Sequence, residues 1–208
     1  MTRINIDPAL AVRAVRAYNR GRYRGRLNVD IDRDGYERFR HGLSADTAAL
    51  IEQLRFVGED YGGAQARFIP HGYHDEAALM VTRLAPGRQE LSTIVNGLPP
   101  LSAAAPNPGV LARLFAPFVV TKRWGVWASK TLHFLRPASF PVLDSRAKKA
   151  LGVASLGSSA ADYHRFCLRF REALSDNVQA LLAARTADDG ESPSDLKLLD
   201  KILYEVGQ

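Results

Sequence analysis

Apolar residues recur along most of this chain at intervals of three and four, the spacing of a buried face on an α-helix. Asp7-Pro8 can cap a first helix whose apolar positions include Leu10 and Tyr18. Ser44 or Asp46 can begin a second helix that continues through Val57. The same pattern predicts further helices over residues 71–86, 110–118, 126–135 and 160–184, a short helix from Asp144 to near Gly152, and a final helix from Ser194 or Asp195 through Leu203.

The segments between these helices are short, apart from one rich in proline. Residues 91–95 are apolar enough for a buried turn, and 140–143 are too few to support a sheet. Residues 96–109 contain four prolines and two glycines, which makes them the best candidate boundary between two lobes. The pattern therefore predicts a mostly α protein, a single domain of residues 1–208 with two helical lobes around a cleft.

Charge changes this picture because it is concentrated. The net charge is +6, and residues 121–150 alone hold seven Lys or Arg against one acid, Asp144. A second basic stretch, Arg20–Arg26, has Tyr23 among its arginines. Arginines beside an aromatic ring can bind phosphates and stack on a base, although a solvated surface turn explains the same residues.

Composition excludes several classes of protein. No apolar run approaches the roughly 18 residues of a membrane-spanning helix, and the N-terminal region lacks a signal-peptide core. Cys167 is the only cysteine, so an internal disulfide or a cysteine-ligated metal cluster is excluded, and we expect a cytoplasmic protein. His71 and His74 have a spacing suitable for a metal but lack a third ligand, so we expect no metal. No Walker-type loop or dinucleotide fingerprint is present in the sequence, so we expect no cofactor.

Two residues in the basic segment have the chemistry of a catalytic pair. In a helix over 126–135, Lys130 shares a stripe with Trp127 and Phe134, and partial desolvation would lower its pKa. Such a lysine can act as an amine nucleophile, although an ordinary surface lysine has the same spacing. Asp144 can cap the next helix, and its carboxylate can also steady a developing positive charge or accept a proton.

The segment WGVWASKTLHFLRPASFPVLDSRAKKALG resembles the active-site portion of the helix-hairpin-helix DNA glycosylase superfamily, most closely the bacterial 8-oxoguanine-glycosylase-like families. In that superfamily a glycine-containing hairpin leads into a helix whose early lysine attacks C1′, and an aspartate begins the next helix. Here Gly125-Val126 would stand for the hairpin, Lys130 for the nucleophile and Asp144 for the aspartate. The chain departs from the pattern at Trp127, where a second glycine is expected, and in its short spacing of 14 residues from Lys130 to Asp144.

The resemblance implies DNA as the partner and removal of an oxidised purine as the activity, with or without strand cleavage through a lysine Schiff base. The candidate contacts with an extruded base are aromatic or lie beside Lys130: Tyr73, Trp124, Trp127, His133 and Phe134. The candidate phosphate contacts are Lys122, Arg123, Gly125, Arg146, Lys148 and Lys149. Two alternatives remain open: a defence-type N-glycosidase acting on free nucleotides or another nucleic acid, and a non-catalytic module that binds altered bases.

Overall fold

The computed structural model describes residues 4–62, 72–119 and 125–208, and these are mostly α-helical with one two-stranded hairpin. The elements are, in chain order, α1 (Pro8–Arg20), β1 (Arg22–Tyr23), β2 (Arg26–Leu27), α2 (Asn28–Arg38), α3 (Thr47–Glu59), α4 (Tyr73–Leu84), the 3-10 turn η2 (Ala85–Gly87), α5 (Arg88–Gly97), α6 (Pro108–Phe115), the 3-10 turn η3 (Ala116–Phe118), α7 (Gly125–Leu135), α8 (Ser145–Ala150), α9 (Ala160–Asp176), α10 (Val178–Asp188) and α11 (Asp195–Val206).

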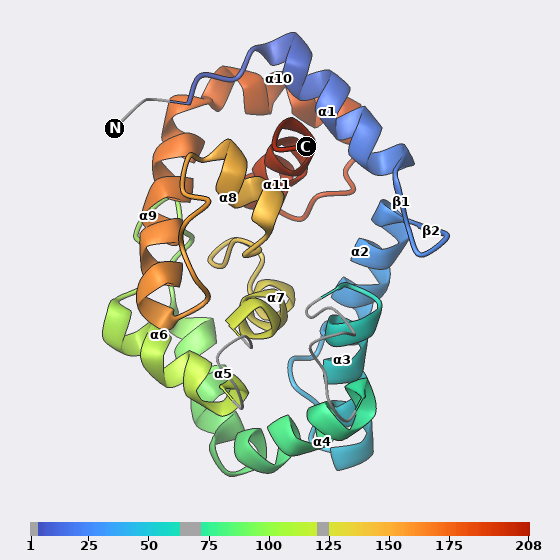
Figure 1. The fold of residues 1–208 in the computed structure, drawn as a ribbon, viewed down its shortest axis with the longest axis vertical. Coiled ribbons are helices and arrows are strands. Elements are labelled where there is room, and N and C mark those ends of the chain that lie inside the picture. Colours follow the sequence, from blue (N-terminus) through green and yellow to red (C-terminus); the bar gives the residue numbers. More distant parts are fainter. Residues whose placement is uncertain (1–3, 63–71, 120–124) are drawn as a thin grey trace.

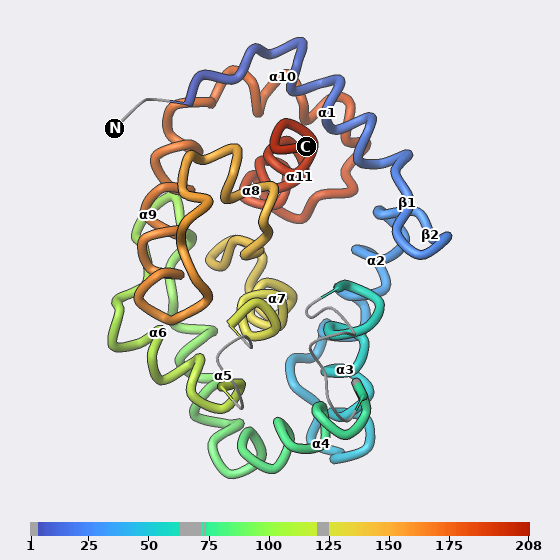
Figure 2. Tube along the Cα trace, viewed as in Figure 1, coloured from blue at the N-terminus to red at the C-terminus, as the bar shows by residue number. Residues whose placement is uncertain are grey.

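Most of the helices surround α7, which lies near the middle of the molecule (Figure 1). α1 packs against α10 and α11, so the N-terminal helix lies beside two C-terminal ones. The trace in Figure 2 shows the same arrangement: α8 and α11 lie inside the outline formed by α1, α10 and α9. α2 and α3 complete the side near the hairpin, and both contact α7. Segments from both ends of the chain therefore enclose the central helix.

Side-chain caps begin the helices at the residues that the sequence indicated. Asp7 accepts a hydrogen bond from the Leu10 amide, and Asp46 accepts one from Ala49. Asp144 and Ser194 cap α8 and α11 in the same way. Such caps bind amide groups that have no partner inside the helix. Because each cap acts within a few residues, the start of the helix can be predicted from the sequence. These four helix starts are confirmed.

Other expectations are wrong. Residues 91–95 are not a buried turn but part of α5, whose apolar face buries Leu91 and Val95. α2 and the hairpin occupy a region where no element was expected. The predicted helix over 160–184 is two helices, α9 and α10, which are separated at Asn177. Asn177 is buried and bonds to the chain near the N-terminus, so tertiary contacts stabilise the break.

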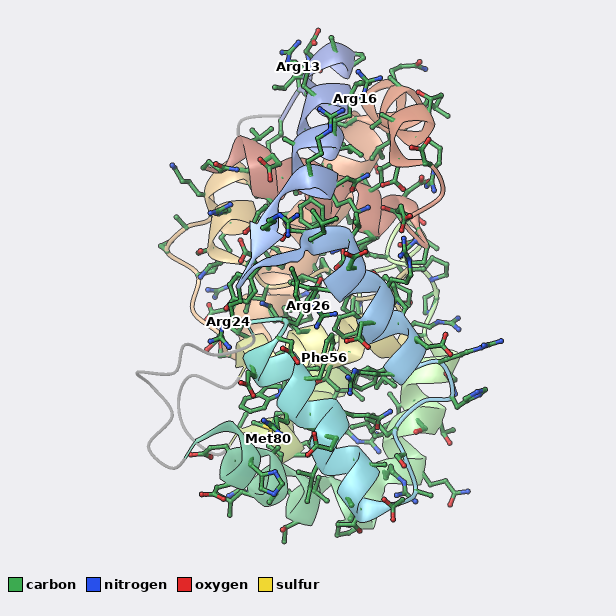
Figure 3. The ribbon with its side chains drawn as sticks, turned by 90° about the vertical axis from the view of Figure 1, so that its right-hand side faces the viewer. Arg13, Arg16, Arg24, Arg26, Phe56 and Met80 are labelled. Atoms are coloured by element: carbon green, nitrogen blue, oxygen red, sulfur yellow. The ribbon has the colours of Figure 1, made fainter. Side chains whose placement is uncertain are left out.

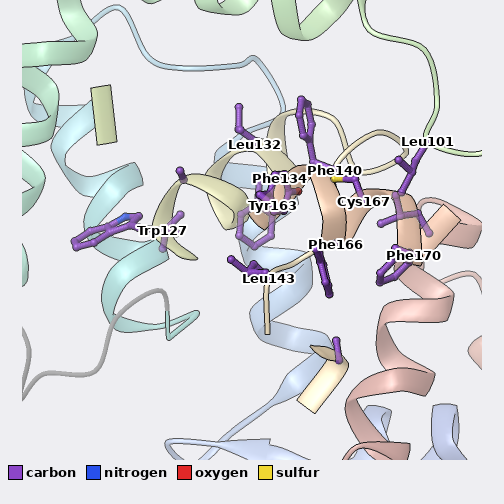
Figure 4. Packing of buried hydrophobic residues seen from close by; sticks show 14 of the residues in the cluster. Leu101, Trp127, Leu132, Phe134, Phe140, Leu143, Tyr163, Phe166, Cys167 and Phe170 are labelled. Carbon is purple, nitrogen blue, oxygen red and sulfur yellow. The ribbon is translucent and has the colours of Figure 1, made fainter. Parts of the chain in front are cut away.

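One cluster of buried hydrophobic residues extends through the described helices, with members on both sides of the proline-rich segment. Leu101 in that segment is fully buried, and its amide donates to the Ala138 carbonyl at 2.8 Å. Ser139 Oγ also donates to the Pro99 carbonyl. Figure 4 shows Phe140, Phe166 and Phe170 packed near Leu101, with Trp127 set apart beside α3. Leu101 thus joins the proline-rich segment to the core, and a division into two lobes stays a prediction.

Candidate active site

Lys130 lies on α7, and the surrounding protein buries its ionisable side chain almost completely. Its side chain is 6% exposed, and Nζ donates to the carbonyl oxygens of Tyr61 at 2.8 Å and Gly62 at 2.9 Å, just after α3. Burial lowers the pKa of Lys130 below its usual value, and the carboxylate of Asp144 is the strongest charge acting in the opposite direction. The neutral amine is therefore more populated at a given pH than it is in an exposed lysine.

The two carbonyls also determine which N–H groups or lone pair of the Lys130 nitrogen stay available to a ligand. A neutral amine has two N–H groups and one lone pair, and two acceptors satisfy both N–H groups. The lone pair then remains for a carbon atom in the adjoining cavity. In the ammonium form the third N–H is available for an acceptor there. The same geometry therefore serves a nucleophile in one protonation state and a hydrogen-bond donor in the other.

Asp144 is positioned by the extended segment before α8. Phe140, Val142 and Leu143 of that segment are buried, and the Leu143 amide donates to Ser129 Oγ on α7 at 3.2 Å. The Asp144 carboxylate accepts from the Arg146 amide at 2.7 Å, which fixes one oxygen as the N-cap of α8. The side chain is only half-buried, so capping leaves it open to the cavity.

Lys130 and Asp144 line the same cavity, which has a volume of about 220 Å³. Its wall also includes four aromatic side chains, Tyr18, Tyr23, Tyr61 and Tyr204. Ligand pockets for drug-sized molecules usually measure about 300–1,000 Å³, so this cavity suits a smaller planar group such as one nucleobase. The site thus combines an amine, carboxylates and aromatic surface in a space of limited size.

A buried network of charged groups supports one side of this cavity. Lys197 on α11 is fully buried, with Nζ 3.0 Å from Asp32 Oδ1 and 3.1 Å from Asp200 Oδ2. It also donates to the Tyr61 hydroxyl at 2.9 Å. Burial acts to lower the pKa of Lys197, but the carboxylate of Asp32 and the neighbouring hydroxyls outweigh it, so the pKa is raised well above its usual value.

Asp200 lines the cavity and contacts this network, and its ionisation lies close to neutral pH. Burial raises the pKa of Asp200 to about 6, even though the Lys197 ammonium acts to lower it. Asp144 is among the charges that raise it further. Asp60, Asp144 and Asp200 thus give the cavity wall three carboxyl groups, and sites that transfer protons commonly combine carboxyl groups in different environments.

Trp127 and Phe134 were expected to contact an extruded base, and the structure places both in the core instead. Trp127 is 0% exposed, and its Nε1 donates to the Leu54 carbonyl of α3 at 2.8 Å. Phe134 is 3% exposed and stacks on Phe39, with ring centroids 5.5 Å apart. Neither lines the cavity, because the stripe that carries them packs against α2 and α3.

His133 is also a core residue rather than part of the cavity wall. It is fully buried, and Nδ1 lies 2.8 Å from the Phe140 carbonyl, which can only accept. Nδ1 therefore carries the proton, and Nε2 accepts from the Tyr36 hydroxyl at 2.7 Å. Burial lowers the pKa of His133 to about 3, and the charge of Lys197 adds to the effect. His133 thus stays neutral and links α7 to the segment before Asp144.

The predicted phosphate contacts have varied surroundings. Lys148 Nζ donates to the Leu156 carbonyl, and Lys149 Nζ donates to the carbonyl of Gln208. The guanidinium of Arg146 lies 4.2 Å from the centroid of the Tyr204 ring, and Tyr204 lines the cavity. A Cβ on Gly125 would lie 1.7 Å from the Ser158 carbonyl oxygen, so this glycine allows the close packing of α7 against the chain before α9.

Several expected residues fall outside the described part of the chain: His71, the Tyr73 side chain, Lys122, Arg123 and Trp124. His74 is exposed, with Nδ1 3.8 Å from Glu52 Oε1. Within the described ranges no group of three His, Cys, Asp or Glu side chains is arranged to hold a metal. No helix in those ranges has both the length and the apolar character needed to cross a bilayer.

The sequence did not indicate Tyr61, Asp200 or Tyr204 as site residues. Asp200 and Tyr204 are one turn apart on α11, a spacing that places both on the same face. A signal was present, because Lys197, Asp200 and Lys201 interrupt a helix that is otherwise strongly apolar. Charged residues in such a helix indicate buried ion pairs or a site, but the pattern alone does not identify their partners.

Comparisons of the chain with protein-family models, with curated proteins and with solved structures found no match.

Proposed function

We propose that this protein is a glycosylase-like enzyme, of helix-hairpin-helix glycosylase-like fold, that cleaves the N-glycosidic bond of a damaged base in DNA, an oxidised purine being the favoured substrate. The observation that carries the proposal is the meeting of Lys130 and Asp144 at one small cavity. The amine is buried, has a lowered pKa, and is held by two carbonyls that satisfy its N–H groups. A nucleophilic amine beside a carboxylate is the minimum that displacement at a sugar C1′ requires.

The reaction begins with the neutral Lys130 amine. Its lone pair forms a bond to C1′ as the bond from C1′ to the base nitrogen breaks, and the base leaves with that electron pair and gains a proton from water. Lys130 is then a secondary ammonium, and Asp144 accepts one of its protons. When the C1′–O4′ bond opens, O4′ takes the proton back from Asp144 and a Schiff base remains. The hydroxide left when water protonated the base then takes a proton from C2′, and the electrons of that C–H bond expel the 3′ phosphate, which gives strand cleavage.

The residues around the pair support this chemistry without a cofactor. Tyr61 presents its backbone carbonyl to Lys130, and the ammonium lies 5.0 Å from the centroid of the Tyr61 ring. Asp144 keeps one oxygen on the Arg146 amide, which holds the carboxylate in place during the proton transfers. Before attack, the same carboxylate can stabilise positive charge that develops at C1′ as the base departs.

Borohydride trapping tests the proposal, because borohydride reduces a Schiff base to a stable covalent adduct. We expect the wild-type protein to form an adduct with a duplex containing 8-oxoguanine and none with an undamaged duplex. Lys130→Gln should abolish the adduct, because it removes the attacking amine. Arg113→Gln is the matched control: it removes one positive charge from an exposed side chain on α6 and should trap at the wild-type level.

Thermal unfolding of each variant establishes that loss of trapping is not loss of folding. Adduct formation by Lys130→Gln at the wild-type level would show that another amine attacks. If the wild-type protein forms no adduct, releases no base and leaves no alkali-labile site, the proposal is wrong. Binding that survives both Lys130→Gln and Asp144→Asn, with no product in any case, would instead indicate a non-catalytic module.

A second candidate, an N-glycosidase of free nucleotides, is favoured by the surroundings of Gly125. In the resemblance this glycine belongs to a hairpin that contacts DNA, but here its Cα packs against the Ser158 carbonyl. The cavity of about 220 Å³ also accommodates a single base without a duplex. Release of a base from nucleotides but not from oligonucleotides, measured by chromatography, would support this candidate over the first.

A further inference from the structure

The hairpin formed by β1 and β2 has a turn that constrains one arginine. Arg22 pairs with Leu27 and Tyr23 with Arg26, so Arg24 and Gly25 form a two-residue turn. Both have positive φ, 51° at Arg24 and 84° at Gly25, as a type I′ turn requires. This conformation is uncommon for a residue with a side chain, and such residues are frequent at functional sites. Arg22 Nη1 donates to the Gly25 carbonyl and stabilises the turn.

The hairpin reaches the cavity through Tyr23. This side chain lines the cavity and is 36% exposed. Its hydroxyl lies 3.0 Å from the point where Gly62, with φ of +66°, would carry a Cβ. The Gly62 carbonyl is one of the two that hold Lys130. The guanidinium of Arg24 lies 5.6 Å from the Tyr23 ring centroid, so the turn places a cation near one ring of the cavity wall. Figure 3 shows Arg24 and Arg26 between Arg16 of α1 and Phe56 of α3.

A second tyrosine–arginine pair comes from a distant part of the chain. Tyr204 of α11 lines the cavity, and the Arg146 guanidinium lies 4.2 Å from its ring centroid. The Arg146 amide holds Asp144, which connects this pair to the proposed catalytic carboxylate. Burial raises the pKa of Glu205, and the nearby Arg146 guanidinium acts to lower it. Two guanidinium groups thus each lie near a tyrosine ring that lines the same cavity.

The charges around the cavity favour one orientation of a ligand that carries a phosphate. Asp60, Asp144 and Asp200 all line the cavity, and their carboxylates disfavour a phosphate inside it. The guanidiniums of Arg24 and Arg146 are not among the lining groups and lie near the rings of Tyr23 and Tyr204 instead. A ligand with a planar uncharged part and one or more phosphates satisfies both regions when the planar part enters and the phosphates stay outside. Nucleotides have this composition, and arginine binds their phosphates with two N–H groups at once.

We propose that Arg24 and Arg146 form a phosphate clamp that binds the backbone of a nucleotide whose base lies in the cavity between Tyr23 and Tyr204. This inference rests on the proposed function for the identity of the ligand, but it concerns binding alone. It adds the hairpin to the site and assigns Arg24 a ligand contact. The clamp can serve a nucleotide within a DNA strand or a free nucleotide, because both present the same phosphate.

The test measures binding without chemistry, in protein that carries Lys130→Gln. The probes are a labelled duplex with a tetrahydrofuran abasic analogue, its unmodified counterpart, and a free deoxynucleoside 5′-monophosphate. Arg24→Gly removes the guanidinium but keeps the backbone favourable, since glycine adopts positive φ freely. Arg24→Lys keeps the charge. Arg146→Gln has a matched control in Arg165→Gln, which removes an exposed arginine from α9.

We expect Arg24→Gly and Arg146→Gln each to weaken binding of the abasic duplex about tenfold, as for the loss of one charge-assisted contact. Each should also reduce the slope of log Kd against log salt by about 0.9. Arg24→Lys should keep the slope, and Arg165→Gln should leave both quantities unchanged. Neutral methylphosphonates at the two phosphates that flank the abasic site should weaken wild-type binding but cause no further loss in the Arg24→Gly/Arg146→Gln variant.

The outcomes separate this inference from the proposed function. Wild-type affinity of both arginine variants, or a methylphosphonate effect that persists fully in the double variant, would overturn the clamp. If these variants bind the mononucleotide more weakly than wild type but bind the duplex with wild-type affinity, the clamp serves free nucleotides. If trapping in the lysine-intact protein fails while the arginine effects are present, the proposed reaction is wrong and the clamp stands. If trapping succeeds and the arginine substitutions leave binding unchanged, the clamp is wrong and the proposed reaction stands.

Discussion

At the scale of single residues, Asp144 caps a helix and also supplies the carboxylate of the proposed reaction. Its Oδ1 accepts the Arg146 amide and caps α8, while the half-buried carboxylate also lines the cavity with Lys130. Capping requires only an acceptor, and asparagine caps helices as well as aspartate does. The proposed proton transfers require a carboxylate, because an amide cannot accept a proton at neutral pH. The two tasks can therefore be separated by a change of a single atom.

Asp144→Asn should keep the fold and lose the reaction. We expect its free energy of unfolding to stay within about 0.5 kcal/mol of wild type, since the cap is retained. The rate of base release should fall by about 10²–10⁴, the usual range for loss of an acid–base group. Asp46→Asn, the same change at the cap of α3, is the control and should keep both stability and rate. Equal rates for Asp144→Asn and wild type would remove this carboxylate from the mechanism.

At the scale of elements, the sequence indicated structure wherever the cause was local. The starts of α1, α3, α8 and α11 were predictable because a capping side chain lies two or three residues from its partner. The break between α9 and α10 was not, because Asn177 bonds to Ile6, 171 residues away. The site divides in the same way: Lys130 and Asp144 belong to one segment, whereas Tyr61 and Asp200 join it only through the fold.

The variant Asn177→Ala tests whether the break between α9 and α10 arises from local helix propensity or from tertiary contacts. Alanine is the better helix former, so a continuous helix would be stabilised by this change. Here Asn177 is 3% exposed, accepts from the Ile6 amide at 2.7 Å and donates to the Ile4 carbonyl at 2.8 Å. The variant leaves these groups buried and unpaired, so we expect a loss of about 2–4 kcal/mol in urea unfolding. Asn96→Ala, at an exposed position of α5, is the control and should change stability little.

At the scale of the whole molecule, Lys197 joins parts of the chain that are far apart in sequence. It contacts Asp32 on α2, Asp200 on its own helix and the hydroxyls of Tyr18 on α1 and Tyr61 after α3. Tyr61 holds the Lys130 amine through its carbonyl, so the network also positions the proposed nucleophile. An ion pair this deeply buried adds little to net stability, because the cost of removing its charges from water offsets their attraction. Removing a single member, however, leaves charge in the core without compensation.

Lys197→Met should therefore destabilise the protein strongly, and more so at high pH. We expect a loss of about 3–5 kcal/mol at pH 8, because Asp32 and Asp200 are left without their cation. The pKa of Asp200 is about 6 with Lys197 present and should rise further without it. A carboxyl whose folded pKa is raised contributes stability below its unfolded pKa and loses it as pH rises through the folded value. The difference between wild type and variant in urea unfolding should thus shrink from pH 8 to pH 5. A difference that stays constant over this range would show that Asp200 does not titrate with the network.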